Sequence, residues 1–264
     1  MASKDDIAFA NTLADAAGEV IRPFFRRKID IVDKGAGAAM FDPVTDADKG
    51  AEKAIRALIA RTHPDDGILG EEFPEVEGVS GRIWVIDPVD GTRAFITGAT
   101  QWGTLIALNE SGNPTLGILD QPITRERFIG VAELGTADLH TPDGSHPLKV
   151  RPCAGLSEAV VMTTHPWNYF DASEQATFRK LAESCLLSRF GGDCYAYGLL
   201  AMGFVDVVVE ARLKPWDIQA LIPIVEGAGG IVTDWRGGPC AHGGRVIAAG
   251  DKRVHEAALR ILAG

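Results

Sequence analysis

Two carboxylates separated by two residues follow a short apolar run in the segment 84–92 (WVIDPVDGT). The proline between Asp87 and Asp90 fixes the backbone, and the glycine that follows permits a sharp turn. If Thr92 begins a helix, the backbone N–H groups of Gly91 and Thr92 lie beside the carboxylates and can hold a phosphate. Carboxylate oxygens bind hard cations such as Mg²⁺, and backbone N–H groups bind phosphate. The two together are what metal-assisted phosphoryl transfer requires. A surface Asp-Pro turn with an Asp-Gly bend explains the same residues equally well.

Two other segments place acids where they could act as further oxygen ligands. In 69–72 (LGEE), Glu71 and its neighbour follow a short apolar run, although adjacent glutamates are more often solvated surface residues. In 42–48 (DPVTDAD), a helix start at Thr45 or Asp46 explains one acid by capping but does not explain three. The six histidines are scattered singly and do not form a group of nitrogen ligands. The candidate ligands are therefore carboxylate oxygens, which favour Mg²⁺ or Mn²⁺ over zinc.

A fourth acidic position lies in 214–218 (KPWDI), where Asp217 precedes an apolar run that ends near Ala228. Taken alone, Asp217 is better interpreted as a helix cap. The sequence lacks the G-x-S-x-G, P-loop and H-E-x-x-H motifs of other enzyme classes. The segment 227–230 (GAGG) follows a predicted helix instead of a strand and lacks the spacing of a dinucleotide-binding loop.

Composition excludes several classes of protein. The chain has 264 residues, 46% of them hydrophobic, with a formal net charge of −10, which predicts a folded protein of one large or two small domains. The acidic balance argues against nucleic-acid or anionic-membrane binding, and no apolar run approaches the ~20 residues that span a bilayer. The first residues do not resemble a signal peptide. Four cysteines without a C-x-x-C motif predict reduced thiols in a cytoplasmic protein.

The elements that position these motifs follow from hydrophobic periodicity. In the first half we expect helices over about 5–27 and 45–62, a strand at 82–86 that ends at Asp87, a helix from 92 to 96, and strands near 102–109, 114–120 and 126–132. The second half alternates strands (159–163, 187–190, 205–210, 230–233, 245–249) with helices (172–186, 194–203, 216–228, 252–262). This order predicts an α+β half, about 1–145, joined to an α/β half, about 146–264, in a single unit.

Together the motifs resemble those of the inositol monophosphatase superfamily, the lithium-sensitive Mg²⁺-dependent phosphatases. The resemblance extends from about residue 10 to the C-terminus and keeps the family's order and spacing. It implies a layered sandwich with alternating α-β-α-β-α layers. The segments that carry it are 42–48 (DPVTDAD), 70–72 (GEE), 84–92 (WVIDPVDGT), 216–217 (WD) and 226–230 (EGAGG).

By this resemblance, Asp87 bridges metal ions in a cluster that holds two or three Mg²⁺, for which Mn²⁺ can substitute. The other metal ligands are Glu71, the Val89 carbonyl, Asp90 and Asp217. Thr92 accepts a hydrogen bond from a metal-bound water and donates one to Asp48, and this dyad helps to form the attacking hydroxide. Gly91 and Thr92 hold the phosphate. Lys34 lies near the acidic motif at a spacing that differs from the family's.

The substrate pocket of the family corresponds here to the segment 190–197 (FGGDCYAY) and to Glu210. Gly192, Asp193 and Glu210 are therefore candidate substrate-binding residues. Inositol phosphatases carry a small neutral residue where this chain has Asp193, and an ammonium group would benefit from the added charge. The segment resembles the histidinol-phosphate phosphatase branch, whose substrate carries an ammonium and an imidazole. Alternatively, Asp193 only caps the helix that follows.

The resulting hypothesis is a cytoplasmic, Mg²⁺-dependent phosphomonoesterase of histidine biosynthesis that releases L-histidinol from its phosphate. An inositol-1-monophosphatase or a broad sugar-phosphate phosphatase is the alternative within the same fold. A non-catalytic regulator that binds metal and phosphate is the alternative from a different class. Besides a small phosphorylated substrate, we expect a second copy of the chain as partner, by family analogy alone.

Overall fold

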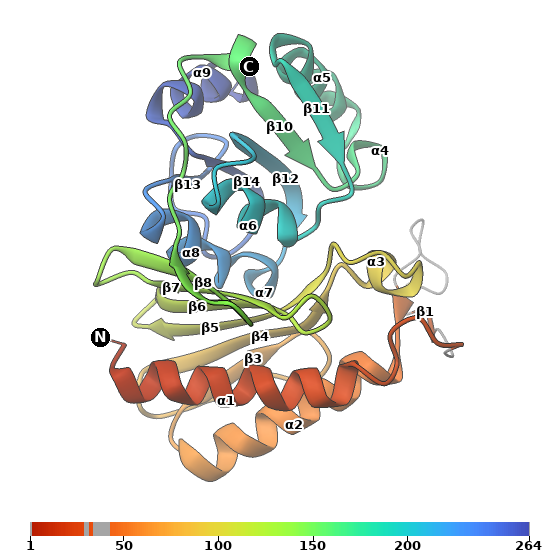
Figure 1. Cartoon of the computed structure of the whole chain (residues 1–264), viewed down its shortest axis with the longest axis vertical. Coiled ribbons are helices and arrows are strands. Elements are labelled where there is room, and N and C mark those ends of the chain that lie inside the picture. Colours follow the sequence, from red (N-terminus) through yellow and green to blue (C-terminus); the bar gives the residue numbers. More distant parts are fainter. Residues whose placement is uncertain (1, 29–31, 34–42, 264) are drawn as a thin grey trace.

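The computed structural model describes residues 2–28, 32–33 and 43–263. Helices and sheets alternate in five layers (Figure 1). From bottom to top in that view, the layers are α1 with α2, a seven-stranded sheet, α6 to α8, a five-stranded sheet, and α5 with α9. The predicted α-β-α-β-α sandwich is confirmed. Lys34 and Asp42 lie outside the described residues.

The larger sheet has the strand order β3-β4-β5-β6-β7-β8-β9. Strands β3 and β4 are parallel, and every later pair is antiparallel. The hairpin of β8 and β9 was not predicted, because its exposed, polar strands carry little hydrophobic periodicity. The strands are β3 (Gly67–Gly70), β4 (Arg82–Asp90), β5 (Gly103–Glu110), β6 (Asn113–Gln121), β7 (Glu126–Val131), β8 (Thr136–Thr141) and β9 (Gly144–Pro147).

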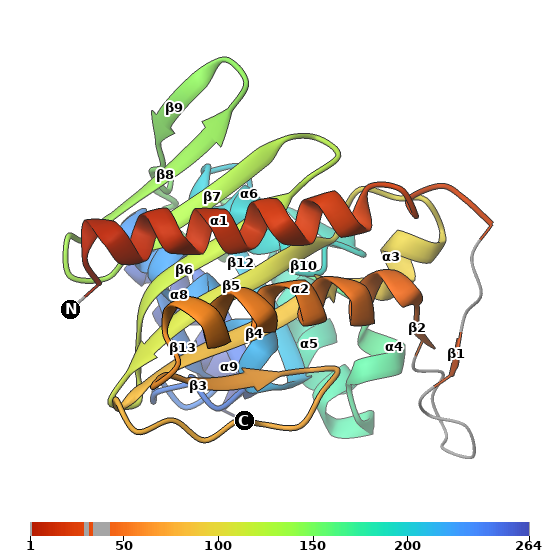
Figure 2. The ribbon, with the colours of Figure 1, turned by 90° about the horizontal axis from the view of Figure 1, so that it is seen from below.

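Helices α1 (Lys4–Ile21) and α2 (Asp46–Thr62) lie side by side across the outer face of this sheet (Figure 2). Each starts with a capping box, at Ser3 and at Thr45. Helix α1 ends earlier than predicted, because Pro23 has no N–H to donate to the Glu19 carbonyl. The short strands β1 (Val32–Asp33) and β2 (Pro43–Val44) pair with each other, and α3 (Thr92–Ile96) follows β4.

The smaller sheet has the order β11-β10-β12-β14-β13 and lies between α6–α8 and the outer helices. Strand β10 pairs in parallel with β11 and β12, and β14 is antiparallel to β12 and β13. Its strands are β10 (Val160–Thr163), β11 (Leu187–Phe190), β12 (Val207–Leu213), β13 (Ile231–Asp234) and β14 (Gly244–Ala249). The helical segments beside it are η1 (Leu156–Glu158), α4 (Pro166–Tyr169), α5 (Ala172–Ser184) and α9 (Lys252–Leu262).

The middle layer consists of α6 (Tyr195–Ala201), α7 (Pro215–Ile218) and α8 (Leu221–Gly227). Helix α8 packs directly on the larger sheet, since a Cβ at Gly117 would lie 1.9 Å from the Ala220 carbonyl oxygen. The helix predicted over 216–228 is divided into α7 and α8. Pro223 explains the break, because it has no N–H to donate to the Gln219 carbonyl. Buried side chains on both sides of this layer form one continuous hydrophobic cluster.

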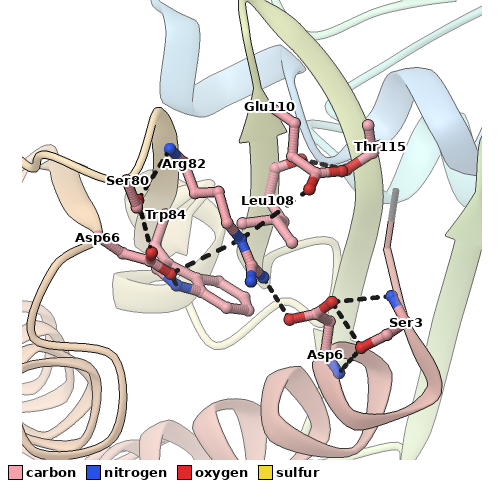
Figure 3. A network of polar contacts seen from close by, with 9 residues as sticks. All are labelled: Ser3, Asp6, Asp66, Ser80, Arg82, Trp84, Leu108, Glu110 and Thr115. Atoms are coloured by element: carbon pink, nitrogen blue, oxygen red, sulfur yellow. Dashed lines mark hydrogen bonds and ion pairs between the residues drawn. The ribbon is translucent and has the colours of Figure 1, made fainter.

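A network of polar contacts anchors α1 to the start of β4 (Figure 3). The guanidinium group of Arg82 pairs with Asp6 of α1 and lies 3.8 Å from Oδ2 of Asp66 and 4.0 Å from Oε1 of Glu110. The indole N–H of Trp84 donates to Asp66 at 2.9 Å. These contacts fix the end of β4 opposite to the acidic motif. Within the described residues, no helix is both long and apolar enough to cross a membrane.

Candidate active site

A β-bulge near the end of β4 directs two acids toward one site. Asp87 pairs with Leu105 and Asp90 with Gly103, so the register shifts by one residue between them. In a regular strand, side chains three positions apart point to opposite faces of the sheet. The extra residue in the bulge lets the side chains of Asp87 and Asp90 point to the same face. Pro88 sits in the bulge, and its carbonyl accepts a hydrogen bond from Thr104.

Asp217 joins this pair from the middle layer. Helix α7 lies between β4 and β12, and one carboxylate oxygen from each of Asp87, Asp90 and Asp217 lies within 4.8 Å of the others. One Asp217 oxygen also accepts the backbone N–H of Lys214 at 2.7 Å. The N-cap of α7 is thus Lys214 and not Asp217, which is the third residue of the helix and accepts the N–H of the N-cap residue. The same side chain also belongs to the acidic cluster.

Burial and the charges of nearby acids raise the pKa of all three aspartates. Burial is the main cause of the raised pKa of Asp87, and the charges of Glu71, Asp90 and Asp217 add to it. Burial also raises the pKa of Asp90 to about 6, although the backbone N–H of Cys194 opposes the shift. The pKa of Asp217 is raised by burial and then by Asp90. A divalent cation would relieve this repulsion, and carboxylates are the ligands that Mg²⁺ and Mn²⁺ prefer.

Glu71 directly follows β3, the strand that pairs in parallel with β4. Strand β3 ends at Gly70, and the Glu71 N–H donates to the Ile86 carbonyl at 3.3 Å. The Glu71 charge raises the pKa of Asp87 and of Asp48, so it lies close to both. The structure thus brings Asp87, Asp90 and Asp217 to one site, and Glu71 lies beside it, directly after the carboxyl end of β3. The fifth predicted ligand, the Val89 carbonyl, lies within the bulge.

The predicted hydrogen bond from Thr92 to Asp48 is not the one that the structure shows. The Thr92 hydroxyl donates to the Val89 carbonyl at 3.1 Å, and Asp48 Oδ2 accepts the backbone N–H and the hydroxyl of Thr45. Asp48 is the third residue of α2, so the capping box places its carboxylate over the start of its own helix. Asp48 remains near the acidic cluster, because its charge raises the pKa of Asp87, and Thr92 is two residues from Asp90 along the chain.

Gly91 has the left-handed backbone conformation that the predicted turn requires, with a φ of 87°. The helix expected to begin at Thr92 does begin there. A Cβ at Gly91 would also lie 3.0 Å from the Gln101 carbonyl oxygen and 3.1 Å from the Cβ of Asp193. Glycine therefore permits both the turn and the close approach of Asp193 to the acidic strand end.

Asp193 and Gly192 lie just before α6, beside the cluster. The N-cap residue of α6 is Cys194, and its N–H donates to Asp90 at 2.8 Å, so Asp90, from outside the helix, satisfies this N–H instead of Asp193. Burial raises the pKa of Asp193 and the charges of Asp90 and Glu210 raise it further, while Arg93 lowers it. Gly192 is buried where a Cβ would lie 2.7 Å from Met162.

Glu210 lies on β12, and its carboxylate is fully enclosed. It accepts hydrogen bonds from the backbone N–H of Thr164 at 2.7 Å, from the Thr164 hydroxyl at 2.9 Å and from the Thr163 hydroxyl at 3.3 Å. Burial nevertheless raises its pKa to about 8. The charge of Asp90 adds to this shift, and the charge of Glu210 in turn raises the pKa of Asp193.

Several residues of the site were missed by the sequence analysis. Thr163 and Thr164 hold Glu210, and only their position at the end of a predicted strand could have indicated them. Arg93 lies over the ring of Tyr169 at 5.2 Å, and the charges of Asp193, Asp90 and Glu210 contribute to a Tyr169 pKa of about 12, although burial is its main cause. This pair therefore borders the substrate end of the site.

Comparisons with known proteins agree with this site. The chain is 46% identical to an inositol monophosphatase from Zymomonas mobilis, with a TM-score of 0.88 and all of both chains covered. It is 43% identical to the bifunctional phosphatase IMPL2 of Arabidopsis thaliana, over 97% of this chain and 74% of that protein. It is 39% identical to a histidinol-phosphatase from Chlorobaculum parvum, over 88% of this chain and 86% of that protein.

The fold, the cluster of carboxylates and these relatives define a metal-dependent phosphatase. The description of the inositol monophosphatase family matches residues 3–263, and the chain belongs to that family.

Proposed function

We propose that this chain is a Mg²⁺-dependent phosphomonoesterase that hydrolyses L-histidinol phosphate to L-histidinol and phosphate. Asp87, Asp90, Asp217, Glu71 and the Val89 carbonyl would hold the cation. When bound, Mg²⁺ supplies positive charge for the phosphate and lowers the pKa of water. The backbone at Gly91 and Thr92 orients the phosphate, and the chain holds the ester so that water reaches phosphorus in line with the leaving alcohol.

The observation that carries the choice of substrate is the proximity of Asp193 to Glu210. The charge of Glu210 raises the pKa of Asp193, and a cation between the two carboxyl groups would oppose that shift. The ammonium of histidinol phosphate would provide that cation, and a neutral polyol would not. The histidinol-phosphatase of Chlorobaculum parvum is also among the relatives of this chain.

A second candidate is hydrolysis of inositol 1-phosphate or of a sugar phosphate. Arg93 lowers the pKa of Asp193, so a cation already faces this acid from the protein. The inositol monophosphatase of Zymomonas mobilis, with 46% identity over the whole chain, supports this candidate as well.

Parallel assays of phosphate release test the proposal. Histidinol phosphate, inositol 1-phosphate and fructose 1,6-bisphosphate are compared at equal concentration with Mg²⁺ and with EDTA. The proposal expects the highest kcat/KM for histidinol phosphate. A preference for either other ester would favour the second candidate. Release from none of them, with retained cation binding, would favour a non-catalytic regulator.

We further propose that two copies of the chain form the active protein. Strand β11 is an edge strand, and exposed apolar side chains lie on and beside it, at Leu187, Phe190 and Trp167. An edge strand can pair with its own copy about a twofold axis. Light scattering should give twice the mass of the chain, and Leu187→Lys should lower it. A monomeric wild-type protein would contradict the proposal.

A further inference from the structure

Three charged side chains follow one another along α2 at intervals of one turn: Asp48, Glu52 and Arg56. Residues four apart in a helix lie on the same face, so all three face the strand end that precedes Glu71. Asp48 and Glu52 are buried, at 1% and 0% exposure. A fully buried glutamate requires partners, because an unpaired charge in the interior is costly.

Glu52 and Arg56 together hold the backbone on both sides of Glu72. Oε2 of Glu52 accepts the N–H of Glu72 at 2.8 Å, and Oε1 pairs with the Nε of Arg56 at 2.7 Å. Arg56 in turn donates from Nη2 to the Phe73 carbonyl at 3.0 Å, and its guanidinium lies 5.9 Å from the Phe73 ring. The helix therefore fixes the backbone directly after Glu71.

The residue before Glu71 is fixed by the same carboxylate. A Cβ added to Gly70 would lie 2.2 Å from Oε1 of Glu52 and 2.6 Å from its Cδ. Gly70 is thus the residue that allows the Glu52 carboxylate to pack against the end of β3. Both neighbours of Glu71 therefore contact Glu52: Gly70 packs against its carboxylate, and Glu72 donates a hydrogen bond to it.

We propose that Glu52 is a positioning residue that holds Glu71 in the geometry needed to bind the divalent cation. Residues that orient metal ligands from behind contribute strongly to metal affinity. Glu52 also lies one turn from Asp48, so the same contact sets the distance between Asp48 and the Glu71 segment. The proposal rests on the metal-dependent phosphatase function proposed above, and it concerns the cation and not the substrate.

The test measures cation binding to the substrate-free protein by calorimetry, with Mg²⁺ and with Mn²⁺. Glu52→Gln keeps the shape of the side chain but removes the charge that pairs with Arg56, and it should weaken cation binding by roughly 10- to 100-fold. In the assay, the Mg²⁺ concentration for half-maximal rate should rise equally, while kcat at saturating Mg²⁺ should stay within about twofold.

Two further variants separate the effect of the length of the Glu52 side chain from the effect of its charge. Glu52→Asp keeps the charge but shortens the side chain by one methylene, so it should not rescue the affinity. Gly70→Ala disturbs the same contact from the β3 side, because its Cβ would clash with the Glu52 carboxylate, and it should weaken cation binding as well. Glu19→Gln, on the exposed face of α1, is the matched control and should bind the cation like the wild type.

Unchanged cation affinity in a folded Glu52→Gln variant would overturn the proposal. A lower melting temperature with wild-type affinity would also overturn it, because Glu52 would then serve only stability. A wild-type chain that binds neither cation would overturn it together with the metal site. If the wild type binds the cation but does not hydrolyse histidinol phosphate, the proposed substrate fails while the affinities still decide the role of Glu52.

Discussion

The backbone N–H of Cys194 donates a 2.8 Å hydrogen bond to Oδ2 of Asp90, which links the first turn of α6 to the end of β4. Because Asp193 directly precedes Cys194, the acid proposed to bind the substrate's ammonium is held in a fixed relation to the acidic cluster. Gly91 allows this contact, since a Cβ at this position would lie 3.1 Å from the Cβ of Asp193. The phosphate end and the head-group end of the site therefore share one rigid junction.

Asp87→Asn is expected to remove nearly all phosphatase activity without unfolding the chain. The side chain of Asp87 is buried beside Asp90 and Asp217, and the amide keeps its shape but removes a charge that repels its neighbours. The melting temperature in EDTA should therefore equal or exceed that of the wild type, while Mg²⁺-dependent phosphate release is lost. Near-normal turnover with the same Mg²⁺ requirement would contradict the proposed metal site.

Cation binding should strengthen as the pH rises from about 5 to 7. Burial raises the pKa of Asp90 to about 6. Below that pH the group is protonated and a cation must displace the proton, whereas above it the carboxylate is already ionised. Calorimetry in two buffers of different ionisation enthalpy should show proton release that declines across this range. An affinity that does not change with pH would mean that Asp90 is not a ligand.

The Thr92 hydroxyl should matter more for turnover than for binding. It donates to the Val89 carbonyl and can still accept a hydrogen bond from water beside the phosphate. If it helps to orient that water, Thr92→Ala should lower kcat by roughly 100-fold with little change in KM. Thr92→Ser should keep much of the rate. A change in KM alone would make Thr92 a phosphate contact and leave Asp48 as a helix cap.

The sequence allowed the acidic site to be predicted because its ligands lie in short local motifs. Asp87 and Asp90 lie at the end of the apolar strand β4, and Gly91 and the helix start that follow fix the turn without help from distant residues. Helix α9 and strand β11 were predicted with the bounds that the structure shows. Local periodicity and caps are sufficient for such elements.

Contacts between distant segments could not be predicted in the same way. The bulge that turns Asp87 and Asp90 to one side depends on the register with β5. The hydrogen bond between Cys194 and Asp90 joins residues 104 positions apart. The partner of Asp48 was predicted wrongly, because a capping box with Thr45 satisfies its carboxylate locally. Glu52 carries no signal beyond its spacing from Asp48.

Asp6→Asn should lower the stability of the fold near neutral pH but not in acid. Burial alone would raise the pKa of Asp6, but hydrogen bonds from Ser3 and Arg82 outweigh it and hold the pKa below its ordinary value. The ionised group therefore stabilises the fold above pH ~4, and this contribution is lost as the pH falls further.

At pH 7, loss of a hydrogen-bonded charge costs about 1.5 kcal/mol, or about 3–6 °C in melting temperature for a chain of this size. Thermal unfolding of Asp6→Asn and wild type at several pH values measures the difference, and Asp5→Asn, at an exposed position of the same helix, is the control. A difference between variant and wild type that persists below about pH 3 would contradict the proposed role of the charge.

Asp193→Asn separates the two candidate substrates. The amide keeps the shape of the side chain and removes the charge that faces Glu210. If the two acids hold an ammonium, a contact of ~1.5–3 kcal/mol is lost, and kcat/KM on histidinol phosphate should fall by roughly 10- to 150-fold. Hydrolysis of glycerol 2-phosphate, whose head group is neutral, should barely change.

Both esters must be measured at the same Mg²⁺ concentration, because Asp193 adjoins Asp90 through Cys194. A shift in the Mg²⁺ requirement would show that the variant disturbs the cluster. Equal losses on the two esters would therefore assign Asp193 to the support of the cluster and remove the case for an amino-alcohol phosphate. No loss on either ester would favour inositol or sugar phosphates, because Arg93 would then neutralise Asp193 within the protein. Only a selective loss on histidinol phosphate agrees with an ammonium bound between Asp193 and Glu210.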